Sequence, residues 1–531
     1  MKNLKIALAL LLAVALCLTL FAACAKTETP AKADEPAKTD TTPAKTDEPA
    51  KTDTPAKTDE PAPADEPDEI VDIVYWSFDD YGKGQDHHDR IQAAVNKITE
   101  PEGIHVDITY MSFGDWSTKV QMGLAGGDRC DVIALAITNN ITNMRLNKML
   151  RTDITDIWKE YAAEAMETVD YLMAPYIGAD GTIYGLPAGR ANVGTTFLIL
   201  NGEVIDELGI GDQVAAMHSF SELEEVLKIV KEAYPDWYAI TPYRKTLIPA
   251  NYGGDSWDDF IVADGAGDST GTCFNNNGKL ELYQKRDSYY NSIKLAADWF
   301  NKGYVVPDGL YNDNQGDPDM KAKIAFANMP CGSEGTELTV SNNKTSFFEY
   351  KAVAKALYTN VLSTGNATTW GTGVPVTCEE PEAAVKFINM MYTRADLMNT
   401  LVHGEEGVDY DVVNGECVRR ENSFANGNFI SGNNLLTWPL QGNGADYWER
   451  IDQSDRSAPR SQYYGFVLDT SDLQLLISQI SAVSDQYAQT LGCGGYTEEL
   501  YQEYIAKLEA AGVYDYIDAV QAQIDAWVAA Q

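Results

Sequence analysis

The chain lacks most of the patterns that mark an enzyme or a metalloprotein. It contains no GxSxG nucleophile elbow, no HExxH zinc motif and no phosphate-binding P-loop. It has only five histidines, and no two of them stand at the i, i+4 spacing of a helical zinc site. No two cysteines form a CxxC pair. The motifs therefore predict neither catalysis nor a cofactor or bound metal.

The chain is also poor in positive charge. Its 40 Lys and Arg face 79 Asp and Glu, which gives a net charge of −39 and leaves no basic patch to bind nucleic acid or anionic lipid. Asp255, Asp258 and Asp259 could supply a glycosidase carboxylate pair, but so acidic a chain forms such clusters by chance. The segment 313–324 departs from the calcium-loop pattern at its glycine and at its last ligand. We expect a solvated acidic loop at the first place and no EF-hand at the second, where the sequence leaves a looser calcium site open.

The N-terminus has the anatomy of a secretory signal peptide. Lys2 and Lys5 flank the start of an apolar run that ends at Phe21, and Ala22-Ala23 then precede Cys24. This ending resembles the lipobox of bacterial lipoproteins, although Phe21 replaces the usual leucine. We predict a lipoprotein signal peptide over 1–23 and a lipid on Cys24. A plain signal peptide or an uncleaved anchor is the alternative, in which Cys24 is incidental.

Residues 24–68 have the composition of a disordered linker. From Ala25 to Asp68 there is no aromatic residue and no Leu, Ile, Val or Met, so this stretch cannot bury enough surface to offset the entropy of ordering. Its eight prolines favour extended backbone. Residues 69–531 contain no further run of 18 apolar residues and are too long for one core.

The start of this domain alternates between strand and helix patterns. Strand-like runs cover 70–76, 104–110 and 131–136, with helical patterns between them, the second over 115–125. The third strand is continuously apolar, as expected for a parallel sheet covered on both faces. These features predict a doubly wound α/β lobe, whose ligands bind at the carboxyl ends of the strands.

Several segments resemble one protein family in the same order along the chain. They are LAGGDRCDVIAL (124–135), DGTIYGLPAGRANVGTTFLILNGEVIDELGI (180–210), HSFSELEEVLKIV (218–230), KIAFANMPCG (323–332), HGEEGVDYDVVNG (403–415), NGNFISGNNLLTWP (426–439) and LEAAGVYDYIDAVQAQIDAW (508–527). They resemble the extracellular solute-binding proteins of ABC importers, and most of all the carbohydrate-binding type. The last three resemble a lipoprotein subfamily of these binders.

The resemblance implies a two-lobed periplasmic-binding-protein-like fold of type II, with a hinge between the lobes. We expect the first lobe to comprise about 69–188 and 333–370, and the second about 197–325 and 376–531. Clustered Gly and Pro at 185–194 and 371–375 fit two hinge crossings, although ordinary loops would show the same pattern. The implied partners are a heterodimeric permease and a separate ATPase. The binder would be a monomer, lipid-anchored at the outer face of the bacterial membrane.

Sugar recognition would need aromatic planes for C–H faces and polar groups for hydroxyls. The residues that best combine loop context with this chemistry are Trp76, Asp79, Asp80, Arg190, Tyr252, Asp255, Trp257, Trp370 and Trp438. Trp76 and Trp257 are the strongest of these candidates, because their loops make core burial less favourable. The other interpretation of each candidate is a structural aromatic or a surface charge. We expect Trp116, Trp158, Trp299 and Trp527, which stand on helical patterns, to be packing residues.

The predicted function is capture of a carbohydrate, an oligosaccharide, for an ABC importer. One alternative keeps the fold and changes the ligand to a peptide, an amino acid or a polyol. Another is a surface lipoprotein that degrades glycans. The sequence does not identify the sugar, and it leaves the pairing of the six domain cysteines open.

Overall fold

The computed structural model describes residues 69–249, 252–257, 268–312, 316–332 and 337–531. The chain divides into two units, 1–64 and 65–531, and every described residue belongs to the second. The predicted signal peptide, Cys24 and the linker lie outside the described residues, as do Asp258, Asp259 and Asp313. In the described part, no helix is long and apolar enough to cross a membrane.

The first sheet has five strands in the order β2-β1-β3-β12-β4. They are β1 (Val71–Phe78), β2 (Ile104–Met111), β3 (Val132–Ala136), β4 (Gly185–Pro187) and β12 (Trp370–Gly373). Strand β1 runs parallel to β2 and β3, whereas β12 is antiparallel to β3 and β4. The three strands predicted from periodicity are confirmed. The first is longer than expected, since Ser77 and Phe78 continue β1 instead of opening a loop.

Helices and a hairpin surround this sheet. The helices are α2 (Gln85–Thr99), α3 (Phe113–Gly126), α4 (Ile141–Leu146), α5 (Thr155–Tyr161), α6 (Ala163–Thr168), α13 (Thr364–Thr368), α14 (Pro381–Thr393), α15 (Ala395–His403) and α16 (Tyr447–Ser457). The 3-10 turns are η1 (Glu100–Glu102), η2 (Asp170–Leu172), η3 (Ala174–Tyr176) and η7 (Asn434–Leu436), and the hairpin is β13 (Tyr410–Val413) with β14 (Glu416–Arg419). Helix α3 matches the pattern predicted at 115–125: Ser112 caps its first turn and Gly127 ends it in the left-handed conformation.

The second sheet is built on β5, which is buried along its whole length. Its strands are β5 (Thr195–Asn201), β6 (Tyr238–Ile240), β9 (Ala325–Asn328), β10 (Cys331–Gly332) and β11 (Ala352–Thr359). Strand β5 pairs with β9, β10 and β11, all antiparallel, and β9 pairs with β6 in parallel. Its helices are α7 (Gly202–Leu208), α8 (Gly211–Ala216), α9 (Phe220–Ala233), α11 (Gly316–Lys321) and α12 (Glu337–Phe348).

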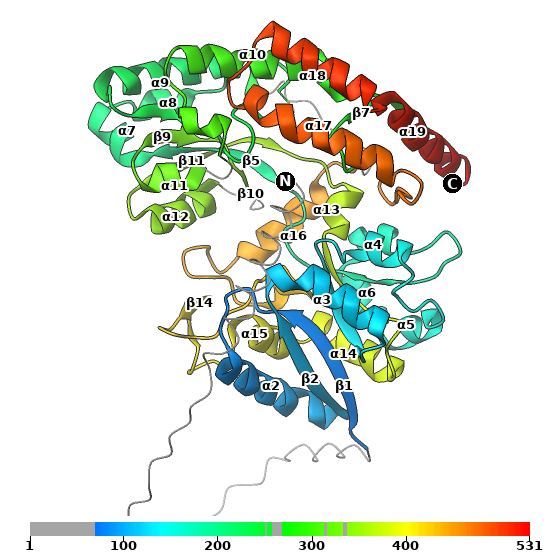
Figure 1. Ribbon diagram of the computed structural model, residues 1–531. Helices are drawn as coiled ribbons and strands as arrows, with labels where there is room; N and C mark the ends of the chain where they lie inside the picture. Colours follow the sequence, from blue (N-terminus) through cyan, green and yellow to red (C-terminus); the bar gives the residue numbers. More distant parts are fainter. Residues whose placement is uncertain (1–68, 250–251, 258–267, 313–315, 333–336) are drawn as a thin grey trace, which may run out of the picture. The chain divides into compact units, whose positions relative to one another are not determined.

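A helical layer formed by residues from two distant parts of the chain completes the second lobe. It contains α10 (Asp287–Asn301), α17 (Gln474–Gly492), α18 (Glu498–Ala510), α19 (Val513–Ala529), the turns η5 (Tyr283–Lys285) and η6 (Pro307–Leu310), and the hairpin β7 (Cys273–Asn276) with β8 (Lys279–Leu282). Figure 1 shows the C-terminal helices α17 and α19 beside each other and α10 close to α18. One apolar cluster joins this layer, with Tyr504, Tyr516 and Leu508 fully buried in it.

The core clusters correct the predicted lobe boundaries. The first core runs over residues 73–193 and returns over 362–430. The second-lobe cores span 197–357 and, in the helical layer, 273–293 with 463–524. Residues 337–359 therefore belong to the second lobe, because β11 pairs with β5 along seven positions. Residues 376–457 belong to the first lobe, where α14 and α15 enter the core.

The boundary predicted at 371–375 is misplaced because the clustered glycines there were interpreted as hinge residues. Gly371 and Gly373 lie in β12, at the centre of the first sheet. A Cβ at Gly371 would stand 2.6 Å from the carbonyl oxygen of Leu186 and 2.6 Å from the hydroxyl of Tyr176. These glycines permit close strand packing, so their conformational freedom is not used for bending.

Candidate functional site

Three chain segments cross between the lobes and are hydrogen-bonded to one another. The backbone N–H of Asn360 donates to the carbonyl of Gly194 (2.8 Å), and that of Leu362 donates to Pro459 (2.8 Å). The N–H of Ser461 donates to the carbonyl of Leu362 (2.9 Å). The first of these segments, at Gly194, lies within the predicted crossing near 188–197. The second lies near 360–362 instead of 371–375, and a third near 459–461 was not predicted.

A buried carboxylate binds the first crossing. Asp455, on α16, is 2% exposed. Its two oxygens accept the backbone N–H groups of Asn192 (2.7 Å) and Val193 (2.9 Å). Burial raises the pKa of Asp455 to about 6, although these two hydrogen bonds and the positive charge of Arg190 oppose the rise. The carboxylate therefore fixes the crossing through hydrogen bonds that compete with a desolvation cost.

A pocket of about 370 Å³ lies beside this carboxylate and the first crossing. We call it the hinge pocket, and it is lined by Arg190, Ala191, Asn343, Asn428, Phe429, Leu440, Asn443, Tyr447 and Trp448. Asn343 comes from α12 of the second lobe, and the other lining residues come from the first lobe and the first crossing. The volume falls in the range of small-molecule sites.

Aromatic rings stand at the carboxyl ends of the first-lobe strands, next to this pocket. Trp370 meets the ring of Phe429 edge-on, with centroids 4.9 Å apart, and meets Phe113 at 6.0 Å. Phe78, the last residue of β1, packs between Phe113 (4.6 Å) and the buried Trp116 (3.9 Å). Trp370, Phe113 and Phe429 are each half-buried, so their rings can offer apolar surface to a ligand.

A second pocket of about 340 Å³ adjoins the first across Asn343. This second-lobe pocket is lined by Phe197, Tyr243, Asp317, Pro330, Cys331, Gly332, Val340, Asn343, Lys344 and Phe347. The ammonium group of Lys344 lies 2.6 Å from the carboxylate of Asp317. Because the two pockets share Asn343, they can serve one extended ligand.

A polar bridge links the lobes at the hinge pocket. The guanidinium of Arg450, on α16, donates to the hydroxyl of Thr339 on α12 (3.2 Å) and to the carbonyl of Asn443 (2.5 Å). The amide of Asn342 donates to the carbonyl of Gly442 (3.1 Å). These bonds connect α12 of the second lobe to the 440–446 loop of the first.

Three of the predicted site residues lie at or near this site. Arg190 lines the hinge pocket, and its Nη1 atom donates to the carbonyl of Ala191 (2.8 Å). Trp370 contacts Phe429 of the pocket wall. Asp80 lies close to Gly427, where a Cβ would stand 3.0 Å from its carboxylate. Burial raises the pKa of Asp80, with the charge of Asp79 as a smaller cause.

The two strongest sequence candidates are buried, contrary to the expectation that their loops would keep them exposed. Trp76 lies inside β1, 6% exposed, in the first core, where it packs against Gly123 of α3. Trp257 is also 6% exposed and belongs to the second core. Trp76 shortly precedes polar residues in the sequence and Trp257 stands among them, but both side chains pack in apolar cores. Loop-like neighbours in sequence did not imply an exposed ring.

The other candidates have local structural roles. Asp255 accepts the backbone N–H and the hydroxyl of Ser221 at the start of α9, and Tyr252 packs against Phe220. Asp79 accepts the N–H of Lys83 (3.0 Å). Trp438 is 38% exposed, but it lines neither the hinge pocket nor the second-lobe pocket. Of the predicted packing residues, Trp116, Trp158 and Trp299 are fully buried and Trp527 is half-buried.

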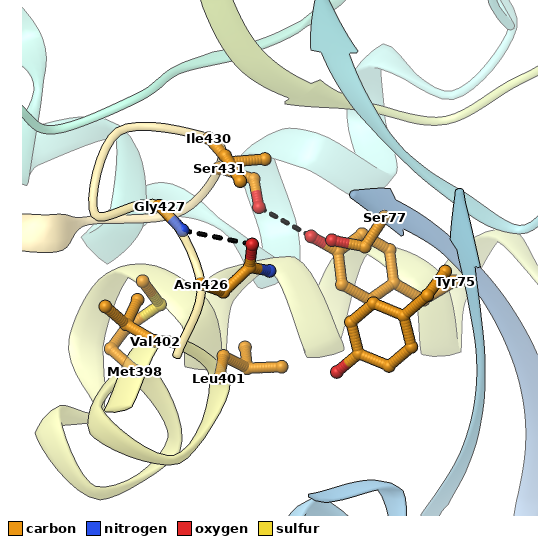
Figure 2. A pocket seen from close by; sticks show the side chains of 10 residues that line it. Tyr75, Ser77, Met398, Leu401, Val402, Asn426, Gly427, Ile430 and Ser431 are labelled. Carbon is orange, nitrogen blue, oxygen red and sulfur yellow. Dashed lines mark hydrogen bonds between the residues drawn. The ribbon is translucent and has the colours of Figure 1, made fainter. Parts of the chain in front are cut away.

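A much smaller cavity lies inside the first lobe. Figure 2 shows the hydroxyl of Tyr75 hydrogen-bonded to Ser431 at its edge, with Asn426 bonded to the N–H of Gly427. Its volume of about 10 Å³ has room for about one water molecule. The cavity is too small for a solute and belongs to the packing of the first core.

Most pocket residues were missed by sequence reasoning. Asn428 stands in the segment 426–439, which was noted for its family resemblance, whereas Asn443 and Trp448 lie beyond that segment. The one sequence signal for the two asparagines is the density of Asn and Gly in 426–444, which is typical of a surface loop as well. These residues come together in one pocket only because α16 and this loop pack in the first lobe.

No metal site or disulfide is found in the described ranges. No group of three or more His, Cys, Asp and Glu side chains there could hold a metal. The six cysteines described form no disulfide, and of these Cys331 is exposed while the other five are buried.

Two α/β lobes joined by three hydrogen-bonded crossings, with a polar and aromatic pocket between them, define a two-lobed solute-binding protein. The chain belongs to the bacterial extracellular solute-binding proteins, whose family pattern matches residues 84–397, more than half of its length. Residues 462–529 match a second family, described as a domain of unknown function. That match covers much of the helical layer of the second lobe.

Individual relatives agree with this family. A carbohydrate ABC transporter substrate-binding protein of Streptococcus pneumoniae serotype 4 is 24% identical over 467 residues, which cover 84% of this chain and 89% of the relative. The structure of an N-glycan transport solute-binding protein (NgtS) from S. pneumoniae is similar with a TM-score of 0.71 and 20% identity, over 86% of this chain and 98% of that one. An HMO-binding, ABC-transporter-associated protein of Bifidobacterium longum infantis gives 0.64 and 17%, over 87% and 99%. The predicted periplasmic-binding-protein-like fold is confirmed.

Proposed function

We propose that this chain is the membrane-anchored binding component of an ABC importer and that it captures an oligosaccharide between its lobes. The hinge pocket carries the proposal, because one cavity combines an aromatic wall with several amide side chains. Aromatic faces pack on sugar C–H groups, and amides can donate to and accept from hydroxyls. The relatives described as carbohydrate, N-glycan and HMO binders support the same ligand class.

The proposed mechanism is binding without chemistry. A ligand that contacts both lobes stabilises the closed state over the open one by the difference in its affinity for the two. Asn343 is placed to provide the second-lobe contact, since it lines both pockets. The closed monomer then docks on a heterodimeric permease, whose ATPase is a separate chain.

A ligand screen tests this function. Residues 65–531 form one compact unit, so the protein can be prepared from residue 65. Oligosaccharides of varied linkage, peptides, amino acids and polyols are compared by thermal unfolding. A ligand at 100 times its Kd should add about 2.7 kcal/mol of stability. Stabilisation by peptides, amino acids or polyols alone would overturn the carbohydrate assignment. Release of reducing sugar from an oligosaccharide would instead establish a glycan-degrading enzyme.

Cys331 offers a readout that locates the ligand. It lines the second-lobe pocket and is the one exposed cysteine among those described. An aromatic disulfide reagent should label it, and the stabilising oligosaccharide should slow that labelling. Cys331→Ser should remove the fast labelling phase but keep the thermal shift. Unchanged labelling at saturating ligand would show that the ligand binds elsewhere.

The lipid anchor needs a separate test. We infer that Cys24 carries the lipid and that residues 25–68 tether the domain to the membrane. The full chain expressed in its bacterial host should partition into the detergent phase of Triton X-114. The Cys24→Ser variant should either keep its signal peptide or, where the signal peptide is cleaved, remain in the aqueous phase. Detergent partitioning of a cleaved Cys24→Ser variant would refute the lipid site.

A further inference from the structure

The hinge pocket has an unexpected charge for so acidic a chain. Its lining contains one guanidinium, from Arg190, and no carboxylate, although Asp and Glu outnumber Lys and Arg by 79 to 40 in the whole chain. In the adjoining second-lobe pocket the carboxylate of Asp317 is already paired with Lys344. A negatively charged ligand group would therefore meet a cation and no unpaired carboxylate among these lining residues.

Three buried polar atoms of the same pocket have no hydrogen-bond partner among the described residues. Two are donors, Nε of Arg190 and Nε1 of Trp448, and one is an acceptor, Oδ1 of Asn443. Trp448 and Asn443 are only 7% and 8% exposed. A buried polar atom left without a partner costs about 1–3 kcal/mol. A ligand that satisfies all three atoms would recover that cost on binding.

The guanidinium of Arg190 is held in place by backbone carbonyls, and it forms no ion pair within the described ranges. Nη1 of Arg190 donates to Ala191 (2.8 Å), and Nη2 donates to Asn366 (3.4 Å). Burial lowers the pKa of Arg190, while the carboxylate of Asp455 opposes this effect. Both oxygens of Asp455, however, already accept backbone N–H groups of the first crossing. Among the described residues, Nε of this cation therefore has no hydrogen-bond partner and the guanidinium has no hydrogen-bonded counter-ion.

We propose that the hinge pocket binds a carboxylate-bearing sugar residue of the captured oligosaccharide. Nε of Arg190 and Nε1 of Trp448 donate to the carboxylate, and Oδ1 of Asn443 accepts from a neighbouring hydroxyl. The inference rests on the proposed function and narrows it, because it selects acidic glycans within the carbohydrate class. Hexuronic acids and sialic acids share this chemistry.

The test compares matched pairs of oligosaccharides. Each pair has the same linkages, and one member carries a terminal hexuronate or sialate whose carboxyl is reduced to an alcohol in the other. Isothermal titration of the protein from residue 65 should show at least about tenfold tighter binding of the acidic member, because a hydrogen bond to a charged group contributes about 1.5–3 kcal/mol. Preference within the hexuronate pairs or within the sialate pairs identifies the source of the carboxylate.

Equal binding of both members overturns the inference but leaves the proposed function standing. Binding of neither member in any pair overturns both.

Substitutions test the same point from the protein side. Arg190→Gln should bring the acidic member down to the affinity of the neutral one. Because Arg190 also supports Ala191, a second variant keeps the proposal testable if Arg190→Gln does not fold. Asn428→Asp places a carboxylate on the half-buried wall of the pocket. It should weaken binding of the acidic member at least about fivefold more than it weakens binding of the neutral member.

A matched control separates local charge from net charge. Asn291→Asp adds the same charge at an exposed position of α10, outside both pockets. It should leave the affinity of both members unchanged. Two results would show that the pocket does not recognise a carboxylate. One is that Asn428→Asp weakens binding of both members equally. The other is that Asn291→Asp weakens binding of the acidic member as selectively as Asn428→Asp does.

Discussion

The hinge carboxylate yields a prediction whose size follows from the structure. Asp455→Asn keeps the shape of the side chain but replaces one of its two acceptor oxygens with an NH₂ group. That group would face the backbone N–H of Asn192 or Val193, which the carboxylate now accepts at 2.7 and 2.9 Å. The substitution also removes a titrating carboxyl group. The pH dependence of the free energy of unfolding separates this second effect from the loss of the hydrogen bond.

The sign and size follow from the pKa shift. Burial raises the pKa of Asp455 from 3.8 to about 6. A carboxyl whose pKa is raised by folding contributes its full stabilisation below the unfolded pKa, near 4, and loses it as the pH rises through the folded value, near 6. The difference of about 2 units corresponds to about 3 kcal/mol. Relative to Asp455→Asn, the wild-type free energy of unfolding should therefore fall by about 2–3 kcal/mol from pH 4 to pH 7.

Thermal unfolding of the protein from residue 65 measures this difference. With an unfolding entropy of about 2.1 cal/mol/K per residue over roughly 460 residues, 3 kcal/mol corresponds to a Tm change of about 3 °C. Subtracting the variant removes other titrations, such as that of His403, whose pKa burial lowers to about 4. Asp170→Asn removes a surface carboxylate whose pKa is lowered by its hydrogen bond to Arg456, and it should give a flat difference between pH 5 and 7. A flat difference for Asp455→Asn would refute the reasoning.

Three further substitutions test other parts of the structure. Trp76→Ala should cost about 3–5 kcal/mol in urea unfolding, because it empties a core position, and should leave ligand affinity unchanged in the folded fraction. Gly371→Ala should destabilise the first lobe by about 1–3 kcal/mol, since its Cβ meets backbone at 2.6 Å; a neutral effect would show that β12 can shift. Arg450→Ala removes a bridge between the lobes and should raise the oligosaccharide Kd about threefold or more; unchanged affinity at unchanged Tm would exclude a role in closure.

The sequence predicted the elements better than it predicted their assignment to lobes. Periodicity located β1, β2, β3 and α3, because each buries a regular face against the first core. The return of the chain to the first lobe after β11 has no local signal. It depends on α14 and α15 packing into a core whose first part, residues 73–193, is distant in the sequence. Gly371 was interpreted as a hinge residue for the same reason, since its close neighbour Leu186 is distant in sequence.

The site shows the same limit more sharply. Arg190 lines the pocket because it lies inside a crossing that Gly and Pro mark in the sequence. Trp76 and Trp257 are buried instead of exposed, because the direction in which a side chain points at a strand end or in a loop depends on the register of the whole sheet or on tertiary packing. Asn443 and Trp448 carry no pattern of their own. Their positions follow from α16, which is fixed by contacts to the first crossing and to η7.

Helix α16 joins the pocket to the hinge. It carries Trp448 in the pocket wall and Asp455 at the first crossing, two turns further along the same helix. Arg190, the cation of the pocket, lies inside the first crossing. A ligand that contacts Arg190 and Trp448 therefore acts on the two elements whose hydrogen bonds define the hinge. Because the hydrogen bonds of Asp455 join α16 to the first crossing, binding at the pocket can bias the position of the crossing without any relay through the rest of either lobe.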